Sequence, residues 1–411
     1  MDYHNLQKNV QKAAMISDKN YLLPALPGEL PADILQKASL LPAKAAFLDG
    51  RLAPATRARL AALLEVTNTY YSNLIEGQYS APADMQRAQA APKRERKQLA
   101  DLAMQQLGVQ TSFERIMRRW DADIAWPAML SPELAQQAHR TLFKHAPREQ
   151  LKLHNSERYL VPGKLRTEPD EQVVVGNHLA PDALVVLPML ELLQQQLGSY
   201  SDPRTRLIAA LAYHHRLAWV HPFMDGNGRL VRLITHLQLV YLDLRPNLWS
   251  LSRGLARRQT EYYAVMANAD RPREGDLDGR GQLSLKHYLG FIRFMLDVCI
   301  DQIDYMTEAV DPANMRERIE RLFKHHERIS AAKIRPGSAA AVHALLSMGT
   351  MPRATFKTFL GLSERLAIEE LKRLIELGIV LSPTPKSRDV EPGLPVWFAQ
   401  EIFPDLHRRF I

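Results

Sequence analysis

Cysteine is almost absent from this sequence of 411 residues, in which Cys299 is the only one. A lone cysteine excludes a disulfide within the chain and any zinc site built from several thiolates, and it suits a reducing compartment. We expect Cys299 to be a small core residue, because free cysteine is mostly buried.

Long hydrophobic runs are absent too. The first 15 residues, MDYHNLQKNVQKAAM, contain no apolar stretch of the length that a secretory signal needs. The best hydrophobic run, residues 207–220, is interrupted by His214, His215 and Arg216 and is too short to cross a bilayer as a helix. These absences predict a soluble, cytoplasmic protein with no membrane partner.

Neither charge sign dominates the composition. The 53 Lys and Arg residues exceed the 45 Asp and Glu residues, giving a net charge of +8, which nucleic acid, phosphate or an acidic partner would all fit. Hydrophobic residues make up 46% and charged residues 24%, values typical of globular proteins and not of disordered ones. The length predicts two or three domains.

Helical periodicity dominates the chain and predicts an all-α protein. A Pro- and Gly-rich segment, residues 22–31, is expected to wrap over the surface before the first regular helix. Apolar residues then recur at helical spacing in the segments 54–76, 94–119, 132–143, 183–197, 204–220, 229–242, 285–309 and 316–328. One exception, residues 163–177, predicts a β-hairpin flap around an acidic turn at Glu168, Asp170 and Glu171.

The carboxy-terminal part has a different pattern. Three short helices are predicted at 339–348, 353–360 and 364–377, followed by strands at 379–381 and 396–398 that pair as a wing, the outline of a winged helix-turn-helix. The predicted domains are therefore an amino-terminal helical region (1–125), a central core (126–310), a linker helix (311–335) and the winged helix (336–411).

Residues 221–232, HPFMDGNGRLVR, carry the most chemistry in the sequence. The Gly-Asn-Gly bend at 226–228 has a permissive backbone, and Arg229 opens a helix with an apolar stripe. Such a junction presents free N–H groups and the positive end of a helix dipole, for which phosphate is the natural ligand. Arg229 and Arg232 lie three residues apart on one helix face and can bind separate phosphate oxygens.

Two other side chains of this segment are suited to catalysis. Asp225 offers a hard oxygen ligand of the kind that Mg²⁺ takes together with nucleotide phosphates. His221 can accept a proton from a hydroxyl nucleophile at neutral pH, because the ordinary pKa of an imidazole is about 6.5. A base, a metal ligand, an anion loop and two arginines thus lie in one short segment.

The segment resembles the active-site signature of the Fic family, H-P-F-x-D/E-G-N-G-R-x-x-R, at all nine specified positions. The similarity extends over residues 132–300 through a preceding helix with His214, the flap residues 173–176, and Tyr262 and Tyr263. The resemblance implies a helical Fic core with a β-hairpin flap. It also implies transfer of AMP from ATP to a Ser, Thr or Tyr hydroxyl of a target protein, with Mg²⁺.

The resemblance assigns roles to individual residues. His221 would deprotonate the target hydroxyl, Asp225 would hold Mg²⁺ between the α- and β-phosphates, and Phe223 would anchor the motif in the core. The flap edge at 174–177 would hold an extended target segment as an added strand. The residues implied around the nucleotide are Gly226, Asn227 and Gly228 at the α-phosphate, Arg229 at the β-phosphate, Arg232 at the γ-phosphate, Val175 and Gly176 in the flap, and Tyr262 and Tyr263 at the adenine.

A second motif, SNLIEG at Ser72 to Gly77, resembles the Fic inhibitory signature S/T-x-x-x-E-G/N of the class whose inhibitory helix precedes the core. Gly77 is a helix stop, so Glu76 lies in the last helical turn, where the dipole disfavours an anion and a cation should compensate. The resemblance supplies that cation: Glu76 would pair with Arg232 and leave ATP in an unproductive pose. The same glutamate could orient a water that removes AMP from a modified target.

Several alternatives remain open at this level. Adjacent His214 and His215 point different ways on a helix and lack metal-site spacing, which favours packing over zinc. The basic runs 93–97 and 316–328 fit solvated helix faces as well as nucleic acid. Eleven Lys and Arg against eight Asp and Glu from Lys333 onward leave the winged helix open to DNA, dimerisation or target docking. Rival functions are transfer of another nucleotide or phosphate-bearing group, and a DNA-binding regulator that senses nucleotide; self-modification and a homodimer are further expectations.

Overall fold

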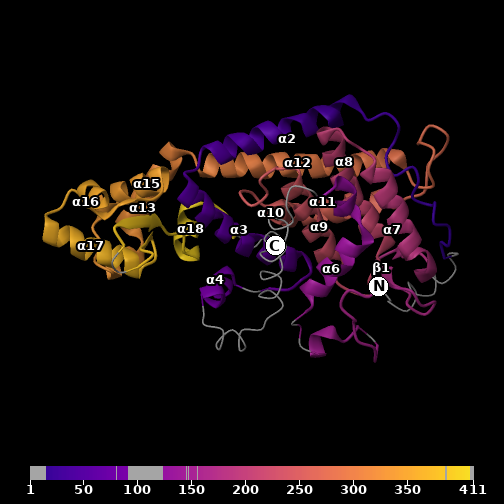
Figure 1. Cartoon of the computed structure of the whole chain (residues 1–411), viewed down its shortest axis with the longest axis horizontal. Helices are drawn as coiled ribbons and strands as arrows, with labels where there is room; N and C mark the ends of the chain where they lie inside the picture. The colour runs from indigo at the N-terminus through magenta and orange to yellow at the C-terminus, as the bar shows by residue number, and fades with distance from the viewer. Residues whose placement is uncertain are drawn as a thin grey trace.

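The computed structural model describes residues 15–79, 81–90, 124–144, 146, 148–154, 156–384 and 387–407. It is an elongated, mostly helical molecule, with a larger body that contains α2 to α12 and a smaller module at the other end that contains α13 to α17 (Figure 1). In the described part no helix is long and apolar enough to cross a membrane. The helix predicted at 94–119 and the basic run at 93–97 lie outside the described residues.

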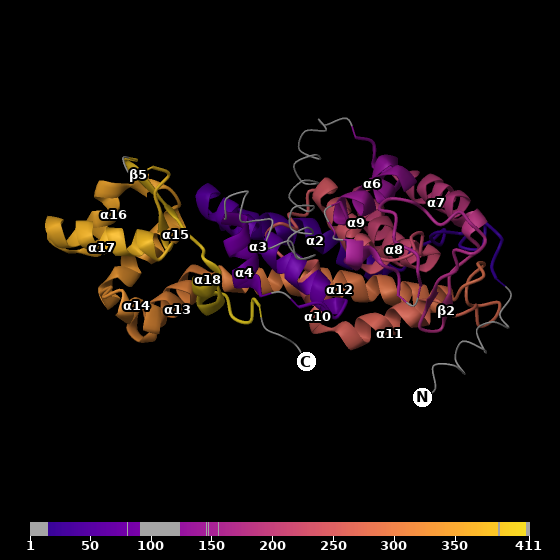
Figure 2. The same cartoon turned by 90° about the horizontal axis from the view of Figure 1, so that it is seen from below.

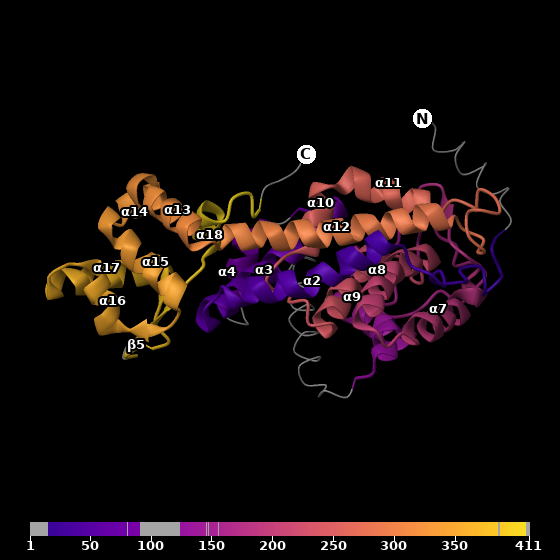
Figure 3. The same cartoon turned by 90° about the horizontal axis from the view of Figure 1, so that it is seen from above.

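Two long helices form the frame of the body. Helices α2 (Ala32–Gly50) and α12 (Leu285–Ala309) lie side by side, as Figures 1 and 3 both show. Lys37 pairs with Asp297 and Lys44 with Asp304, each at 2.5 Å, so the sequence offset is the same at both pairs and the helices run parallel. The buried residues of α2, at positions 34, 38, 41, 45 and 48, repeat at the four-and-three spacing of a coiled coil.

Helix α2 was not among the predicted helices, the first of which began at residue 54. Pro42 lies inside α2, where proline removes one backbone hydrogen bond, and packing against α12 keeps the helix intact. The segment before α2 also differs from the expected surface wrap. Leu22, Ala25 and Leu26 are buried, so this segment contributes to the core. Cys299 is buried in α12, as predicted.

The helices predicted around the motif are confirmed with small shifts of their ends. Sequence signals explain their starts: Pro54 and Pro203 stand at the first position of their helices, and Asp202 accepts a hydrogen bond from Thr205 N as an N-cap. Shorter helices complete the body. The elements are α3 (Pro54–Ile75), α4 (Pro82–Ala90), η2 (Trp126–Leu130), α6 (Pro132–Leu142), η3 (Arg148–Leu151), α7 (Ala183–Gly198), α8 (Pro203–Val220), α9 (Asn227–Tyr241), α10 (Leu251–Arg257) and α11 (Gln259–Ala269).

The flap exists, but its predicted turn was misplaced. Strands β1 (Val174–Val175) and β2 (His178–Leu179) pair antiparallel around a two-residue loop, Gly176 and Asn177, with Gly176 at φ +58°. The acidic segment that we expected at the hairpin tip lies before β1. There the Glu171 carboxylate accepts hydrogen bonds from Thr167 N and Glu168 N, which closes a separate turn.

After α13 and α14, residues 339–392 of the carboxy-terminal module form three helices and a three-stranded antiparallel sheet of order β3-β5-β4. Its helices match the prediction, and Gly361 at φ +65° ends α16 before a short turn into α17, as in a helix-turn-helix. The predicted wing pairing was wrong: residues 396–402 form a helix whose buried side chains recur at helical spacing. The elements are α13 (Pro312–His325), α14 (Glu327–Ala331), η4 (Pro336–Ser338), α15 (Ala339–Met348), β3 (Met351–Pro352), α16 (Arg353–Leu360), α17 (Glu364–Glu376), β4 (Val380–Leu381), β5 (Asp389–Pro392) and α18 (Val396–Ile402).

The chain returns to the body after this module. Figure 2 shows α18 beside α4 and α13, between the module and the larger body. Val396 N donates to Gln86 Oε1, and the carbonyl of Leu406 accepts from Tyr71 Oη. The division into domains at 125, 310 and 335 remains a prediction, but the last described residues pack against the amino-terminal region.

Candidate active site

The motif forms the turn that joins α8 to α9. His221 ends α8 in the left-handed conformation, with φ +49°, and Gly226 precedes α9 with φ +79°. A side chain at Gly226 would collide with the Phe143 ring, so glycine is required both by the backbone angle and by the close approach of α6. This turn directs the amino terminus of α9, with its unpaired N–H groups, toward the site.

His221 is held as a neutral imidazole. Its Nδ1 lies 3.3 Å from the Ala218 carbonyl oxygen, which can only accept, so Nδ1 carries the proton and Nε2 keeps its lone pair. Burial, and then the nearby His178 and Arg166, lower the pKa of His221 to about 3. At neutral pH the imidazole is therefore unprotonated, with the lone pair of Nε2 available as an acceptor.

Two side chains fix the shape of the turn. Asn227 donates to the Phe223 carbonyl at 2.8 Å and accepts from Phe223 N at 3.0 Å, so its amide is committed to the loop. His139 of α6 stacks on the Phe223 ring with centroids 3.9 Å apart. Phe223 is fully buried, as expected of an anchor. Any contact of Asn227 with an anion would thus come through its backbone.

His139 was missed by the sequence reasoning, because a histidine on an amphipathic helix carries no distinguishing signal. Its Nδ1 accepts from Gly163 N at 2.9 Å, so its Nε2 carries the proton and donates to the Asp225 carbonyl at 3.0 Å. Burial lowers the pKa of His139 to about 4. The neutral ring thus joins the loop at Asp225 to the segment that leads into the flap.

The two motifs meet at Arg232. Its Nε donates to Ser72 Oγ and its Nη2 to the Ser72 carbonyl, both at 2.9 Å, and Nη2 also donates to Glu76 Oε1 at 2.6 Å. Ser72 and Glu76 are four residues apart at the end of α3 and therefore face the same way. Arg232 is 3% exposed, so this ion pair is shielded from solvent on the arginine side.

Glu76 occupies the anion position at the start of α9. A Cβ added to Gly228 would collide with the Glu76 carboxylate, which places that carboxylate directly over the glycine bend. Burial alone would raise the pKa of Glu76, but the charge and hydrogen bond of Arg232, and then the charge of Arg229, outweigh burial and lower it. The carboxylate is thus an anion held where the free N–H groups of a helix start can bind one.

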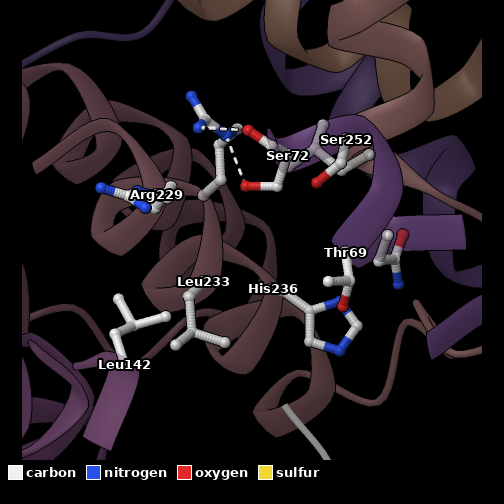
Figure 4. Close-up of a pocket in the computed structure, with 10 residues that line it drawn as sticks. Thr69, Ser72, Leu142, Arg229, Leu233, His236 and Ser252 are labelled. Carbon is white, nitrogen blue, oxygen red and sulfur yellow. Dashed lines mark hydrogen bonds between the residues drawn. The ribbon is translucent and has the colours of Figure 1, made fainter. Parts of the chain in front are cut away.

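Arg229 has no comparable partner. It is 6% exposed, and within the described residues its Nε and Nη1 atoms make no hydrogen bond, while its guanidinium lies 5.0 Å from the centre of the Phe143 ring. A buried cation with unused donors indicates a site for an anion. Arg229 and Arg232 also line a pocket between α3, α6, α9 and α10, in which Ser72, Leu142 and His236 take part (Figure 4).

The two adjacent tyrosines of α11, Tyr262 and Tyr263, differ in burial. Tyr262 is buried and its hydroxyl lies 2.8 Å from His214 Nε2, so it belongs to the core. His214 also contacts Thr235 Oγ1 at 2.8 Å, which accounts for both of its nitrogens by packing within the helices. Tyr263 is 48% exposed and donates to the carbonyl of Ile75 at 2.9 Å, beside the end of α3.

Comparison with known protein families finds a match for the central segment of the chain. A family model described as Fic/DOC family matches residues 129–239, which contain the motif and the helices that hold it. Residues 129–239 belong to the Fic/DOC family. This segment contains the turn between α8 and α9, whereas Ser72 and Glu76, which contact Arg232, lie outside it.

Curated relatives carry the same domain. A protein adenylyltransferase fic-1 of Caenorhabditis briggsae is 31% identical over 139 residues, 32% of this chain and 25% of the relative. A protein adenylyltransferase Fic of Drosophila virilis is 25% identical over 182 residues, 44% of this chain and 33% of the relative. The chain thus spans about a quarter to a third of the length of these relatives.

Two solved structures are similar to the chain. A Fic family protein from Desulfovibrio desulfuricans G20 has a TM-score of 0.44 and 19% identity, covering 89% of this chain and 98% of that one. A Fic domain containing signaling protein from Bacteroides thetaiotaomicron VPI-5482 has a TM-score of 0.45 and 14% identity, covering 67% of this chain and 96% of that one.

A metal ion at this turn would have few ligands from the described residues. Among the described residues, no group of three or more His, Cys, Asp or Glu side chains is placed to hold a metal. Asp225 is exposed at the loop, and its Oδ1 accepts from Gly226 N at 2.6 Å. One carboxylate suits Mg²⁺, which takes its remaining ligands from water and substrate phosphates.

The flap of the Fic domain presents an open edge beside this turn. Val174 and Val175 are 48% and 49% exposed, which is unusual for two consecutive valines. His178 of β2 lies 2.7 Å from the Trp219 carbonyl through Nε2, which holds the hairpin against the end of α8. The exposed strand β1 could pair with an extended peptide.

Buried neutral histidines make the Fic domain sensitive to acid. His139, His214 and His215 are at most 1% exposed, and burial lowers the pKa of each below the ordinary value of about 6.5. The unfolded chain therefore binds protons that the folded chain cannot, and stability falls as pH drops below 6.5. Protonation of His139 in the unfolded chain should by itself lower the free energy of unfolding by about 1.4 kcal/mol at pH 5.5.

We therefore expect a lower midpoint of thermal unfolding at pH 5.5 than at pH 7.5, measured by circular dichroism. His139→Gln should reduce the pH dependence, whereas His154→Gln at an exposed position should leave it unchanged. A midpoint that is the same at both pH values in the unaltered chain would contradict the burial of these histidines as neutral rings.

Proposed function

We propose that this chain is a protein adenylyltransferase that transfers AMP from ATP to a Ser, Thr or Tyr hydroxyl of a target protein. The observation that carries the proposal is the anion position at the start of α9, where the Glu76 carboxylate is held by Arg232 over the glycine bend, next to a neutral His221. Relatives named protein adenylyltransferase, at 25–31% identity, support the same chemistry.

The proposed reaction follows from the placement of these side chains. The target hydroxyl loses its proton to His221 Nε2 while its oxygen attacks the α-phosphorus of ATP. The bond from that phosphorus to the bridging oxygen breaks, and pyrophosphate leaves. The α9 amino terminus and Arg229 supply fixed donors to the phosphates, and Mg²⁺ on Asp225, when bound, would neutralise phosphate charge.

The resting state is proposed to be autoinhibited. Glu76 uses the Arg232 guanidinium that the γ-phosphate would need, and its carboxylate takes space and positive potential at the glycine bend. Because the carboxylate is anionic, it also repels a triphosphate from that end of the site. The same group could hold a water for hydrolysis of an AMP-modified target, so both directions are retained in the proposal.

Mass analysis of the product tests the donor group. The purified chain would be incubated with ATP and Mg²⁺, with and without candidate target proteins, and the added mass on self-modified chain or target measured. Adenylyl addition supports the proposal. Addition of a different nucleotide or phosphate-bearing group would favour the alternative transferase. Loss of AMP from a modified target, with no addition to an unmodified one, would favour the reverse reaction.

The DNA-binding alternative receives less support from the charges on α17. The helix carries four glutamates against three cations. Arg365 lies 3.5 Å from Glu369, Lys372 lies 3.8 Å from Glu376, and Arg373 lies 3.6 Å from Glu370. Cations already matched by carboxylates on their own helix add little attraction for phosphates. We therefore propose the transferase activity as the function, with a regulatory role for the carboxy-terminal module.

A further inference from the structure

Arg166 is a buried cation at the base of the flap that the sequence motif does not include. It is 1% exposed, and its guanidinium donates to four backbone carbonyl oxygens. The acceptors are His221 at 2.8 Å, and Val220, Glu171 and Pro181 at 3.0 Å each. Its own backbone N–H donates to the Pro222 carbonyl at 2.8 Å.

These acceptors belong to two parts of the Fic domain. Val220 and His221 end α8 at the catalytic turn, whereas Glu171 and Pro181 stand on either side of the flap hairpin, before β1 and after β2. The rigid, planar guanidinium of Arg166 therefore holds the segments on both sides of the flap hairpin against the backbone of His221.

The bond to the His221 carbonyl has a particular consequence. His221 has φ +49°, a left-handed conformation that a residue with a Cβ adopts only when its surroundings hold it there. The Arg166 Nε bond to the His221 carbonyl and the Arg166 backbone bond to the Pro222 carbonyl supply that support. The direction of the His221 ring thus depends on Arg166.

We propose that Arg166 is a positioning residue that fixes His221 and the flap in one arrangement, so that a target segment added to β1 presents its hydroxyl to His221 Nε2. The inference rests on the proposed transferase function. Arg166 is placed to act through the backbone of its neighbours, because all four guanidinium bonds go to backbone carbonyls.

The test uses Arg166→Lys in a chain that also carries Glu76→Gly, to make turnover measurable. Lysine keeps the charge but cannot reach four acceptors in a planar fork, and misplacement of a catalytic group by about 1 Å can cost roughly 100-fold in rate. We expect kcat to fall on the order of 10- to 100-fold while KM for ATP changes little. The midpoint of unfolding should also fall, because buried carbonyls lose their donor, so rates are compared at a temperature where both chains are folded.

The matched control is Arg158→Lys, an exposed arginine in the same region that pairs with Asp170 and should leave kcat unchanged. An unchanged kcat in folded Arg166→Lys would overturn the positioning role. A proportional loss of ATP affinity would overturn it too, because that result would indicate a general distortion. Absence of activity in the Glu76→Gly parent would instead reject the proposed function.

A separate set of contacts links the inhibitory helix α3 to the carboxy-terminal part of the chain. Thr56 Oγ1 donates to the carbonyl of Leu346 in α15 at 2.7 Å, in a buried position. Arg59 pairs with Glu391 of β5 at 2.8 Å. Near the other end of α3, Thr67 Oγ1 lies 2.8 Å from His407 Nε2.

We infer that the carboxy-terminal part holds α3 in the position from which Glu76 closes the site, so that its contacts set the degree of inhibition. A helix moves largely as a unit, because its backbone hydrogen bonds connect every turn to the next. Loss of the contacts at Thr56, Arg59 and Thr67 would therefore loosen the Ser72 and Glu76 end as well. This inference also rests on the proposed function.

A triple variant, Thr56→Val, Arg59→Gln and Thr67→Val, tests the link without touching the site. Loss of one buried hydrogen bond and two weaker contacts should raise transfer roughly 10-fold in the otherwise unaltered chain. In the Glu76→Gly background the same changes should have no further effect, because the inhibitory carboxylate is already gone. Amide hydrogen exchange at residues 72–78 should also become faster in the triple variant.

Two results would overturn the link. One is an unchanged rate together with unchanged exchange at residues 72–78. The other is an equal rise in the Glu76→Gly background, which would place the effect outside the inhibitory contact. Inactivity of Glu76→Gly itself, with faster exchange in the triple variant, would reject the transferase function and retain the mechanical link.

Discussion

Glu76→Gly is expected to raise self-modification and target AMPylation on the order of 100-fold, because Arg232 can then hold the γ-phosphate and seat the triphosphate, and misplacement of a substrate by about 1 Å can cost roughly this factor. The substitution frees Arg232, whose Nη2 now donates to Glu76 Oε1 at 2.6 Å, and it removes an anion from above Gly228. The measurement is incorporation of label from α-labelled ATP into the chain and into lysate proteins.

Two further variants separate charge from shape in this experiment. Glu76→Gln keeps the length of the side chain and removes its charge, so it should activate partly. Ser72→Ala removes the hydroxyl that accepts from Arg232 Nε and should have a smaller effect, because the Ser72 carbonyl still accepts. Equal labelling by the unaltered chain and by Glu76→Gly would contradict autoinhibition by this contact.

His221→Ala in the Glu76→Gly background is expected to lower the rate of transfer by roughly 100- to 10,000-fold, the range for loss of a general base. ATP affinity should change less than about threefold, because the phosphates are expected to be bound by the α9 amino terminus and Arg229 and not by the imidazole. Rates from labelled ATP and dissociation constants from calorimetry would be compared for the same preparations.

The backbone at His221 requires a matched variant. With φ +49°, alanine would add strain of its own, whereas asparagine adopts the left-handed conformation more readily. His221→Asn should therefore keep the fold and nucleotide binding and still lack transfer. Turnover retained in His221→Asn would refute the assignment of His221 as the base.

Much of the local structure around the site was predictable from sequence. Helix starts are marked by residues such as Pro54, Pro203 and Asp202, and the bend before α9 by Gly226, because capping and backbone permissiveness act over a few residues. The pairing of Glu76 with Arg232 was predicted only by resemblance, and the structure contains it. Their separation of 156 residues leaves no local signal.

The errors arose where distant segments decide the outcome. The flap turn shifted to Gly176 and Asn177 because the Glu171 carboxylate closes the acidic segment separately. Residues 396–402 became a helix, and the strand expected there was replaced by β5, because pairing partners in a sheet are chosen in space. Helix α2 depends on its parallel partner α12 despite Pro42.

Sequence alone determined the chemistry that we propose for the site, since the residue types and spacing in HPFMDGNGRLVR offer a candidate base, anion loop and metal ligand within one turn. Tertiary structure alone decided the contacts from which we propose how that chemistry is controlled. It placed Glu76 over Gly228, left Arg229 with unused donors, and joined the flap to His221 through Arg166. Contacts between segments far apart in the chain depend on packing of the whole core, which no local pattern encodes.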